Sequence, residues 1–200
     1  FNSSFAYDDG VAESAYGITQ SGAKLAYQFK LNQDDTLRAI QMYFPQMLDS
    51  VNHIPFELTI WDDNGGVPGD TLYTQTVSPV HTTNGRFHSY WLEKPFEISA
   101  GLFYVGWKQQ TNDLLNIGLD KNKIANQYMF YNVGSGWSNS LYPGAWMIRP
   151  IVSMKEVILS SVNKTRHNFL IYPNPAKEEL TLITGLTNNL VSIYNLQGIL

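Results

Sequence analysis

The sequence predicts an all-β protein, an antiparallel β-sandwich of the jelly-roll type. Apolar residues recur at every second position through most of the chain, and helical periodicity is not sustained over three turns. Tyrosine, phenylalanine and tryptophan number 12, 10 and 5, and aromatic side chains favour strands. Turn-forming residues separate the alternating runs at short, regular intervals, as in sandwiches.

We expect about eight or nine strands, a number that favours a jelly roll over a closed barrel. The alternating runs cover residues 25–31, 40–44, 56–60, 73–77, 90–92, 103–107, 128–130 and 146–152. Asn84-Gly85 is the clearest hairpin signal, between the runs before and after it. Residues 111–127 fit a long loop or a short helix.

Composition excludes several classes of function. The net charge is −4 and no basic run is present, which argues against nucleic acid or an anionic membrane surface as partner. No apolar run approaches the length of a membrane span. Cysteine is absent, so thiol catalysis and cysteine-ligated zinc are excluded. Hydrophobic residues make up 44% of the chain, enough to bury a substantial core.

The chain divides into three parts. We expect the sandwich in residues 1–152, a linker in 153–168, where charge rises and aromatic residues are sparse, and a second unit in 169–200. The second unit opens with Tyr172-Pro173-Asn174-Pro175, in which each proline fixes its own φ and holds the preceding residue extended. Two alternating segments follow, and Gly198 stands where the chain must turn.

This order of motifs resembles the first part of the C-terminal (type A) sorting domain of Bacteroidetes proteins exported by the type IX secretion system. The matching features are the Tyr172–Pro175 opening, a leucine-rich strand, and a Val-x-Ile-Tyr-Asn-x-x-Gly strand that ends at Gly198. The resemblance implies a partial, truncated immunoglobulin-like domain, recognition by the secretion machinery, and a protein that is secreted or held at the outer cell surface.

The larger part of the chain resembles a jelly-roll accessory module that commonly precedes such a sorting domain. The resemblance is carried by residues 7–13, 60–69, 101–107 and 147–150. It implies a non-catalytic role and names no ligand.

Two tryptophans are candidate ligand-binding residues. Trp61 shares a strand face with polar Glu57 and Thr59, and Trp137 lies in a loop of glycine, serine and asparagine, so we expect both to be exposed. Exposed aromatic rings next to polar side chains are suited to carbohydrate. The alternative is that all five tryptophans pack in the core or at an interface, as we expect for Trp107 and Trp146.

Asp62, Asp63, Asn64 and Asp70 are candidate calcium ligands, because Ca²⁺ takes carboxylate, amide and carbonyl oxygens on a glycine-bent loop. The alternative is a solvated turn whose Asp and Asn side chains cap their own backbone. Asp8, Asp9 and Glu13 form a second acidic group that the same argument covers.

No catalytic motif is present, since Ser135 lies in a Gly-Ser-Gly turn and not in a nucleophile elbow. We therefore expect no enzyme. The sequence favours a binding or adhesion module of an exported protein, with a glycan or a cell-surface polymer as ligand. The alternative is a structural spacer of a larger secreted hydrolase whose catalytic domain lies upstream.

Overall fold

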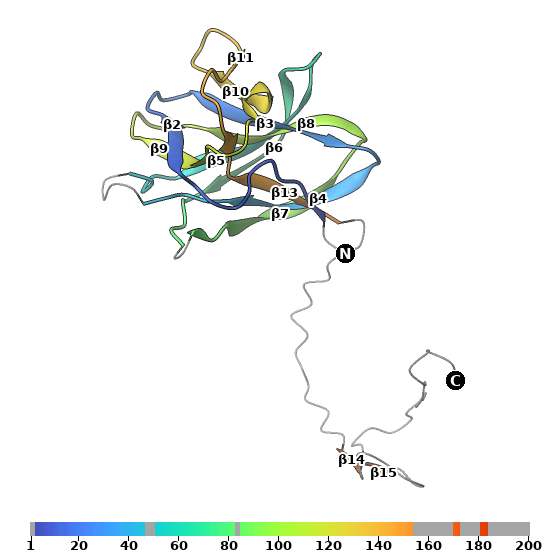
Figure 1. Cartoon of the computed structure of the whole chain (residues 1–200). Coiled ribbons are helices and arrows are strands. Elements are labelled where there is room, and N and C mark those ends of the chain that lie inside the picture. The colour runs from blue at the N-terminus through green and yellow to red at the C-terminus, as the bar shows by residue number, and fades with distance from the viewer. Residues whose placement is uncertain (1–2, 47–50, 83–84, 154–169, 173–180, 184–200) are drawn as a thin grey trace. The chain divides into compact units, whose positions relative to one another are not determined.

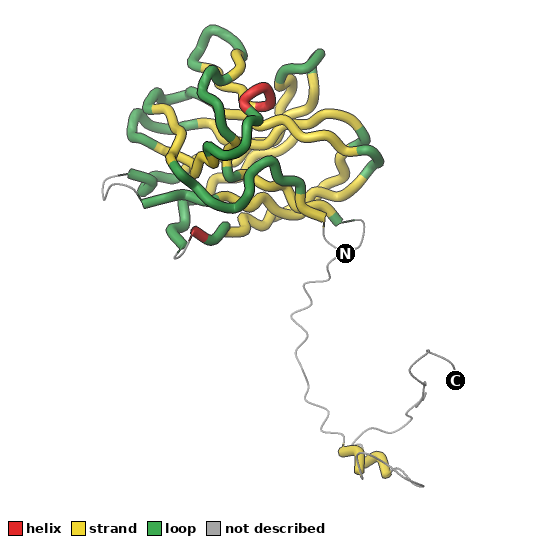
Figure 2. The backbone as a smooth tube through the Cα atoms, viewed as in Figure 1, coloured by secondary structure: helices red, strands yellow, loops and turns green. Residues whose placement is uncertain are grey.

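The computed structural model describes residues 3–46, 51–82, 85–153, 170–172 and 181–183. The chain forms two compact units, Phe1–Glu156 and Val157–Leu200. The described residues are almost entirely strand and loop, which confirms the all-β prediction (Figure 2). A short 3-10 turn, η2 (Asn126–Tyr128), lies between β9 (Leu115–Asp120) and β10 (Met129–Asn132). No helix among the described residues is long and apolar enough to cross a membrane.

One layer of the larger unit is a six-stranded antiparallel sheet of order β11-β10-β3-β8-β5-β6. Its strands are β3 (Lys24–Leu31), β5 (Phe56–Asp63), β6 (Pro68–Val77), β8 (Gly101–Lys108), β10 (Met129–Asn132) and β11 (Ser138–Asn139). The central strands β3 and β8 pair along their full length, from Lys24 opposite Lys108 to Leu31 opposite Gly101. This sheet forms the upper layer in Figure 1.

The facing layer consists of two smaller antiparallel sheets, of orders β1-β13-β4-β7 and β12-β9-β2. Their strands are β1 (Ser3–Ser4), β2 (Ser14–Ile18), β4 (Asp35–Met42), β7 (His88–Ile98), β9 (Leu115–Asp120), β12 (Ala145–Trp146) and β13 (Ile148–Val152). Only Met147 separates β12 from β13, so residues 145–152 run as one strand that changes partner from β9 to β4.

The two small sheets meet where three backbones exchange hydrogen bonds. The Tyr43 N–H donates to the Met147 carbonyl, the Met147 N–H to the Gly118 carbonyl, and the Gly118 N–H to the Tyr43 carbonyl, at 3.2, 2.9 and 2.9 Å. A Cβ at Gly118 would lie 2.7 Å from both the Met147 sulfur and a Tyr43 ring carbon. The close approach therefore requires glycine, and these sheets behave as one layer.

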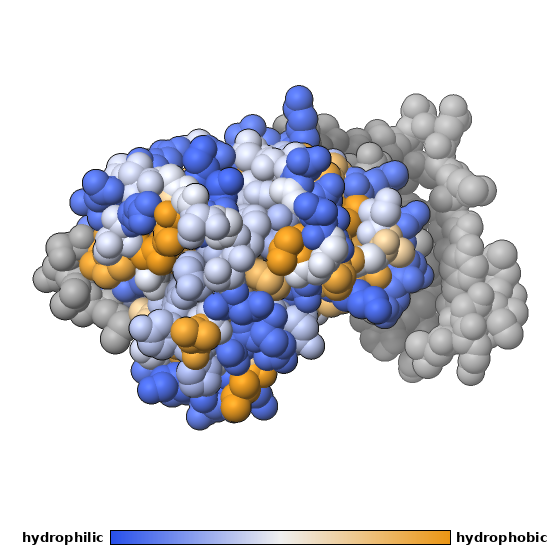
Figure 3. Space-filling model, turned by 90° about the horizontal axis from the view of Figure 1, so that it is seen from above, coloured by the Kyte–Doolittle hydropathy of each residue, from blue (hydrophilic) through white to orange (hydrophobic). Residues whose placement is uncertain are grey.

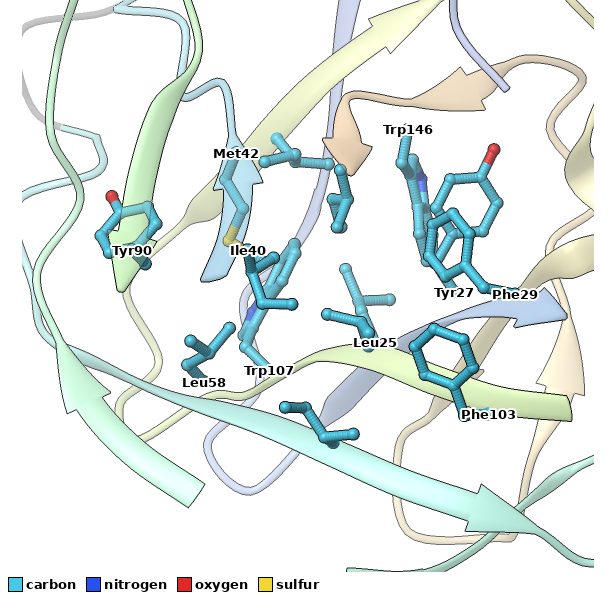
Figure 4. Packing of buried hydrophobic residues seen from close by; sticks show 14 of the residues in the cluster. Leu25, Tyr27, Phe29, Ile40, Met42, Leu58, Tyr90, Phe103, Trp107 and Trp146 are labelled. Carbon is cyan, nitrogen blue, oxygen red and sulfur yellow. The ribbon is translucent and has the colours of Figure 1, made fainter. Parts of the chain in front are cut away.

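The core lies between the layers and is unusually aromatic (Figure 4). Leu25, Tyr27, Phe29 and Leu31 all point into it from β3, as the alternation predicts. Trp107 and Trp146 are fully buried, which confirms their expected place in the core. Each large side chain buried in this way contributes about 1.5–3 kcal/mol.

Two predictions about local structure were wrong. Asn84-Gly85 does not join a hairpin, because β6 pairs with β5 in one layer and β7 pairs with β4 in the other. The connection crosses between layers, a path that a local turn signal does not reveal. The stretch 111–127, expected as a loop or helix, contains β9, in which Asn116 and Asp120 are buried as completely as their apolar neighbours.

The N-terminal segment, residues 5–13, ties the two layers together. The Tyr7 ring stacks on Tyr128 at 4.8 Å, and its O–H donates to the Gln28 carbonyl of β3 at 3.0 Å. The next residue, Asp8, accepts two hydrogen bonds from the Arg149 guanidinium of β13 in the other layer. Burial, with Tyr128 close by, raises the pKa of Tyr7 to about 12, so this ring stays neutral.

In the second unit the structure describes one short antiparallel pair, β14 (Leu170–Tyr172) and β15 (Thr181–Ile183), with Leu170 opposite Ile183. Pro173, Asn174, Pro175 and Gly198 of the sorting motif lie outside the described residues, as does most of the expected immunoglobulin-like domain and linker. Ser153, placed at the start of the linker by the sequence, belongs to the sandwich: it is buried and its N–H donates to the Thr36 carbonyl at 3.0 Å.

Breaking the Asp8–Arg149 ion pair tests whether the N-terminal segment holds the two layers together. The substitution Asp8→Asn keeps the shape but removes the charge of a side chain that is fully buried, with Arg149 left unpaired. We expect the free energy of unfolding to fall by about 2–3 kcal/mol. Urea titration followed by near-UV circular dichroism measures the change.

Glu57→Gln is the matched control, because it breaks the 4.0 Å pair of Lys108 and Glu57 in which both side chains are partly exposed. This substitution should cost less than about 1 kcal/mol. Equal urea midpoints for the two variants would show that the Asp8–Arg149 pair does not hold the layers together.

Candidate binding groove

The two candidate tryptophans come together on the outer face of the six-stranded sheet. Their ring centroids are 5.6 Å apart in an edge-to-face arrangement. Trp61 is only 2% exposed, however, because a second apolar cluster of Ala26, Tyr104 and Phe130 surrounds it and Trp137 packs against that cluster. The expected exposure of Trp61 was therefore wrong: this strand is packed on both faces. Trp137 remains partly exposed.

The acidic loop after Trp61 uses its carboxylates to hold its own turn. Asp62 accepts a hydrogen bond from the Asp70 N–H at 2.5 Å, and Asp63 accepts one from the Gly66 N–H at 3.0 Å. Asp63 also accepts the Tyr104 O–H at 2.7 Å, and burial followed by this bond raises the pKa of Tyr104. These bonds are those expected for a turn whose Asp side chains cap their own backbone. Asn64 belongs to the same turn, and its N–H donates to the Val67 carbonyl.

The four candidate calcium ligands, Asp62, Asp63, Asn64 and Asp70, line one small polar hollow of about 420 Å³. Among the described residues, no group of three or more histidine, aspartate or glutamate side chains is placed to hold a metal ion. The second acidic group is also structural. Asp8 binds Arg149, and both Glu13 oxygens accept hydrogen bonds from the turn that follows β9.

A different site stands out at one flank of the sandwich. A groove of about 780 Å³ opens between the edge strand β2 and the end of β10. Its lining consists of residues 14–18, Leu119, Lys121, Tyr131, Val133 and residues 141–143. From above the view of Figure 1 the surface is mainly hydrophilic, with separate apolar groups (Figure 3).

The backbone edge of β2 borders this groove. All five residues of β2 line the groove. Successive side chains of a strand point to opposite faces, so five consecutive residues line one groove when the groove runs along the edge of the strand. β2 pairs with β9 on one side and has no strand partner on the other. Backbone groups on that side of β2 have no strand partner among the described residues, although the Ile18 carbonyl accepts the Gln109 side-chain amide at 2.8 Å.

The opposite flank of the sandwich is closed by side chains. Gln75 of β6 donates to the Trp91 carbonyl of β7 at 3.3 Å, and the Glu93 N–H of β7 donates to the Tyr73 hydroxyl at 3.1 Å. These bonds cover the edge that β6 and β7 would otherwise present. The contrast makes the uncovered β2 flank the better candidate for a ligand.

Three tyrosines converge on the groove. Tyr16 of β2 contacts Tyr142 edge-to-face, with centroids 5.8 Å apart, and rests on the buried Trp146 at 5.1 Å. Burial is the main cause that raises the pKa of Tyr16, with Tyr131 and Tyr142 close enough to add to it. A hydrogen bond with the Ser140 side chain lowers the pKa in part, and the hydroxyl is neutral near pH 7, with its own O–H as a donor.

Hydrogen bonds through Ser140 fix the loop that carries Tyr142, and the Tyr142 ring is exposed to solvent. The Ser140 N–H donates to the Met129 carbonyl at 2.8 Å, and the Tyr142 N–H donates to the Ser140 hydroxyl at 3.2 Å. Gly144 has a φ of +149°, and a Cβ there would meet Leu119 at 2.6 Å. Tyr142 is consequently 66% exposed, and its neighbour Leu141 is 88% exposed.

Sequence reasoning missed these residues. Tyr16 and Tyr131 lie outside the alternating runs identified in the sequence, and only the folded chain places them on one groove. Tyr142 carried a usable signal, an aromatic residue between Leu141 and Pro143 in a turn, where an apolar ring has no core to enter.

Comparison with protein-family models, with curated proteins and with solved structures finds no match to this chain. Function must therefore be argued from the chemistry of the site.

Calcium titration tests the interpretation of the acidic loop. Because Asp62 and Asp63 already accept backbone N–H groups, we expect the melting temperature in millimolar calcium to equal that in a chelator. A cation bound only by the folded state would raise it. An increase with calcium that Asp63→Asn abolishes would restore the metal site.

Proposed function

We propose that this chain is a non-catalytic, carbohydrate-binding module of a protein that the type IX secretion system delivers to the outer cell surface or the medium. The observation that carries the proposal is the tyrosine-lined groove beside the uncovered edge of β2.

The groove offers the two kinds of contact that a saccharide needs. A pyranose ring presents apolar C–H faces, which suit the rings of Tyr16, Tyr131 and Tyr142. It also carries hydroxyl groups, which require donors and acceptors in fixed positions. The β2 backbone edge and the neutral Tyr16 hydroxyl supply both, and an apolar lining with few placed polar groups is the usual form of a ligand site.

The same lining argues for binding and not for hydrolysis. Cleavage of a glycosidic bond ordinarily uses two carboxyl groups on either side of it. No aspartate, glutamate or histidine is among the described residues that line the groove. A saccharide held there meets no carboxyl pair of the kind that glycoside hydrolysis uses.

Two sequence features support the cellular destination. The Tyr172-Pro173-Asn174-Pro175 opening and the later strand ending at Gly198 match the sorting-domain pattern, and the secretion machinery is the partner that this pattern implies. A glycan or cell-surface polymer is a ligand that a protein at that location would meet.

A glycan array probed with the full chain tests the proposal. We expect binding to at least one glycan, and we expect Tyr142→Ala to weaken it about tenfold, since a stacked aromatic contact contributes roughly 0.5–1.5 kcal/mol beyond its buried area. Tyr142 is largely exposed, so its removal should leave the melting temperature unchanged.

Trp91→Ala is the control. Trp91 is 43% exposed but lies on β7, away from the groove, so its loss should leave glycan binding intact. Absence of binding to every glycan, or equal affinity of the Tyr142 variant and the unaltered chain, would contradict the proposal and favour a spacer role.

A further inference from the structure

One charged side chain lines the groove. Among the described lining residues only Lys121 is ionisable apart from the three tyrosines. It directly follows β9 and is exposed. The charge that a ligand meets in the groove is therefore positive, although the chain as a whole has a net charge of −4.

The acids nearest to Lys121 in the fold are occupied by other donors. Glu13 accepts the Lys121 backbone N–H at 2.8 Å with one carboxylate oxygen and the Asn122 side-chain amide at 2.9 Å with the other. Asp120 is fully buried and accepts the backbone N–H groups of Asp9, Asn122 and Lys123. Hydrogen bonds of this kind stabilise both carboxylates in their charged form and hold them in place, and neither forms an ion pair with the Lys121 ammonium.

The Lys121 ammonium is left without an ionic partner inside the described part of the chain. The ion pairs found there are Lys108–Glu57 and Arg149–Asp8. In an ion pair, the charge of a lysine is offset by the neighbouring carboxylate. Lys121 has no such partner among the described residues, so its ammonium group can pair with a ligand in the groove.

We propose that the groove selects acidic glycans and places a uronate carboxylate against Lys121. This inference rests on the proposed carbohydrate binding. The tyrosine rings and the β2 edge hold the sugar ring, and the ammonium then meets the carboxylate beside an apolar lining, where charge-assisted hydrogen bonds are stronger than in open water.

The negative net charge does not prevent this. At physiological ionic strength charges are largely screened beyond about 8 Å, so the remote acids act weakly on the ligand. Lys121 acts at contact distance. Charge complementarity in the groove therefore outweighs the overall repulsion.

The decisive probes are polygalacturonate, polymannuronate and polyglucuronate, each paired with its carboxyl-reduced counterpart of the same linkage. We expect the full chain to bind at least one polyuronate about tenfold more tightly than its reduced form, the gain of a hydrogen bond to a charged group. Lys121→Gln should remove this difference and leave the affinity for the reduced polymer unchanged.

Lys123→Gln is the matched control. It removes the same charge from the same turn, but Lys123 does not line the groove, so the tenfold preference should persist. Melting temperatures of both variants should equal that of the unaltered chain, because both side chains are exposed.

The alternative results are distinguishable. Equal affinity for acid and reduced polymers overturns the inference while the proposed carbohydrate binding stands. Failure to bind any polymer or any glycan overturns both. Binding of polyglutamate as tight as that of the polyuronates, and unaffected by Tyr142→Ala, would show that the groove takes an acidic peptide.

Discussion

The N-terminal segment is the constraint on which the sandwich depends. Two consecutive residues of this segment contact different layers. The Tyr7 hydroxyl donates a hydrogen bond to β3 in one layer, and Asp8 pairs with Arg149 of β13 in the other. Asp9 adds a backbone N–H to Asp120 of β9 at 2.7 Å. These bonds fix the distance between the two layers. Because the core between the layers is aromatic and tightly packed, that distance also determines how the buried rings pack against one another.

This constraint changes the meaning of the acidic residues. Asp8, Asp62 and Asp63 are predicted from the sequence as candidates for calcium binding, and Asp120 drew no such prediction. In the fold their oxygens accept hydrogen bonds from backbone N–H groups, the Tyr104 hydroxyl and the Arg149 guanidinium. Their role is to shape turns and edges. The groove beside β2 is lined instead by tyrosines, one lysine and apolar residues.

Much of the fold was predictable. The alternating faces of residues 25–31 and 56–60 are buried as expected, because period-two burial is a local property of each strand. The layer to which a strand belongs is not local, so the Asn84-Gly85 signal was misinterpreted. Trp61 was misplaced for a related reason. Polar Glu57 and Thr59 on its face indicated exposure, but Phe130 and Trp137 come from distant parts of the chain to cover it.

Composition and strand periodicity, which are properties of the chain alone, were enough to predict the all-β class and the burial of Trp107 and Trp146. The position of the groove could not be predicted in this way, because it depends on how the strands assemble. The groove exists because one flank of the sandwich is covered by Tyr73 and Gln75 while the other is left open beside β2. Which strand edges remain unpaired follows from the order of strands in each sheet, and that order depends on contacts between residues far apart in the chain.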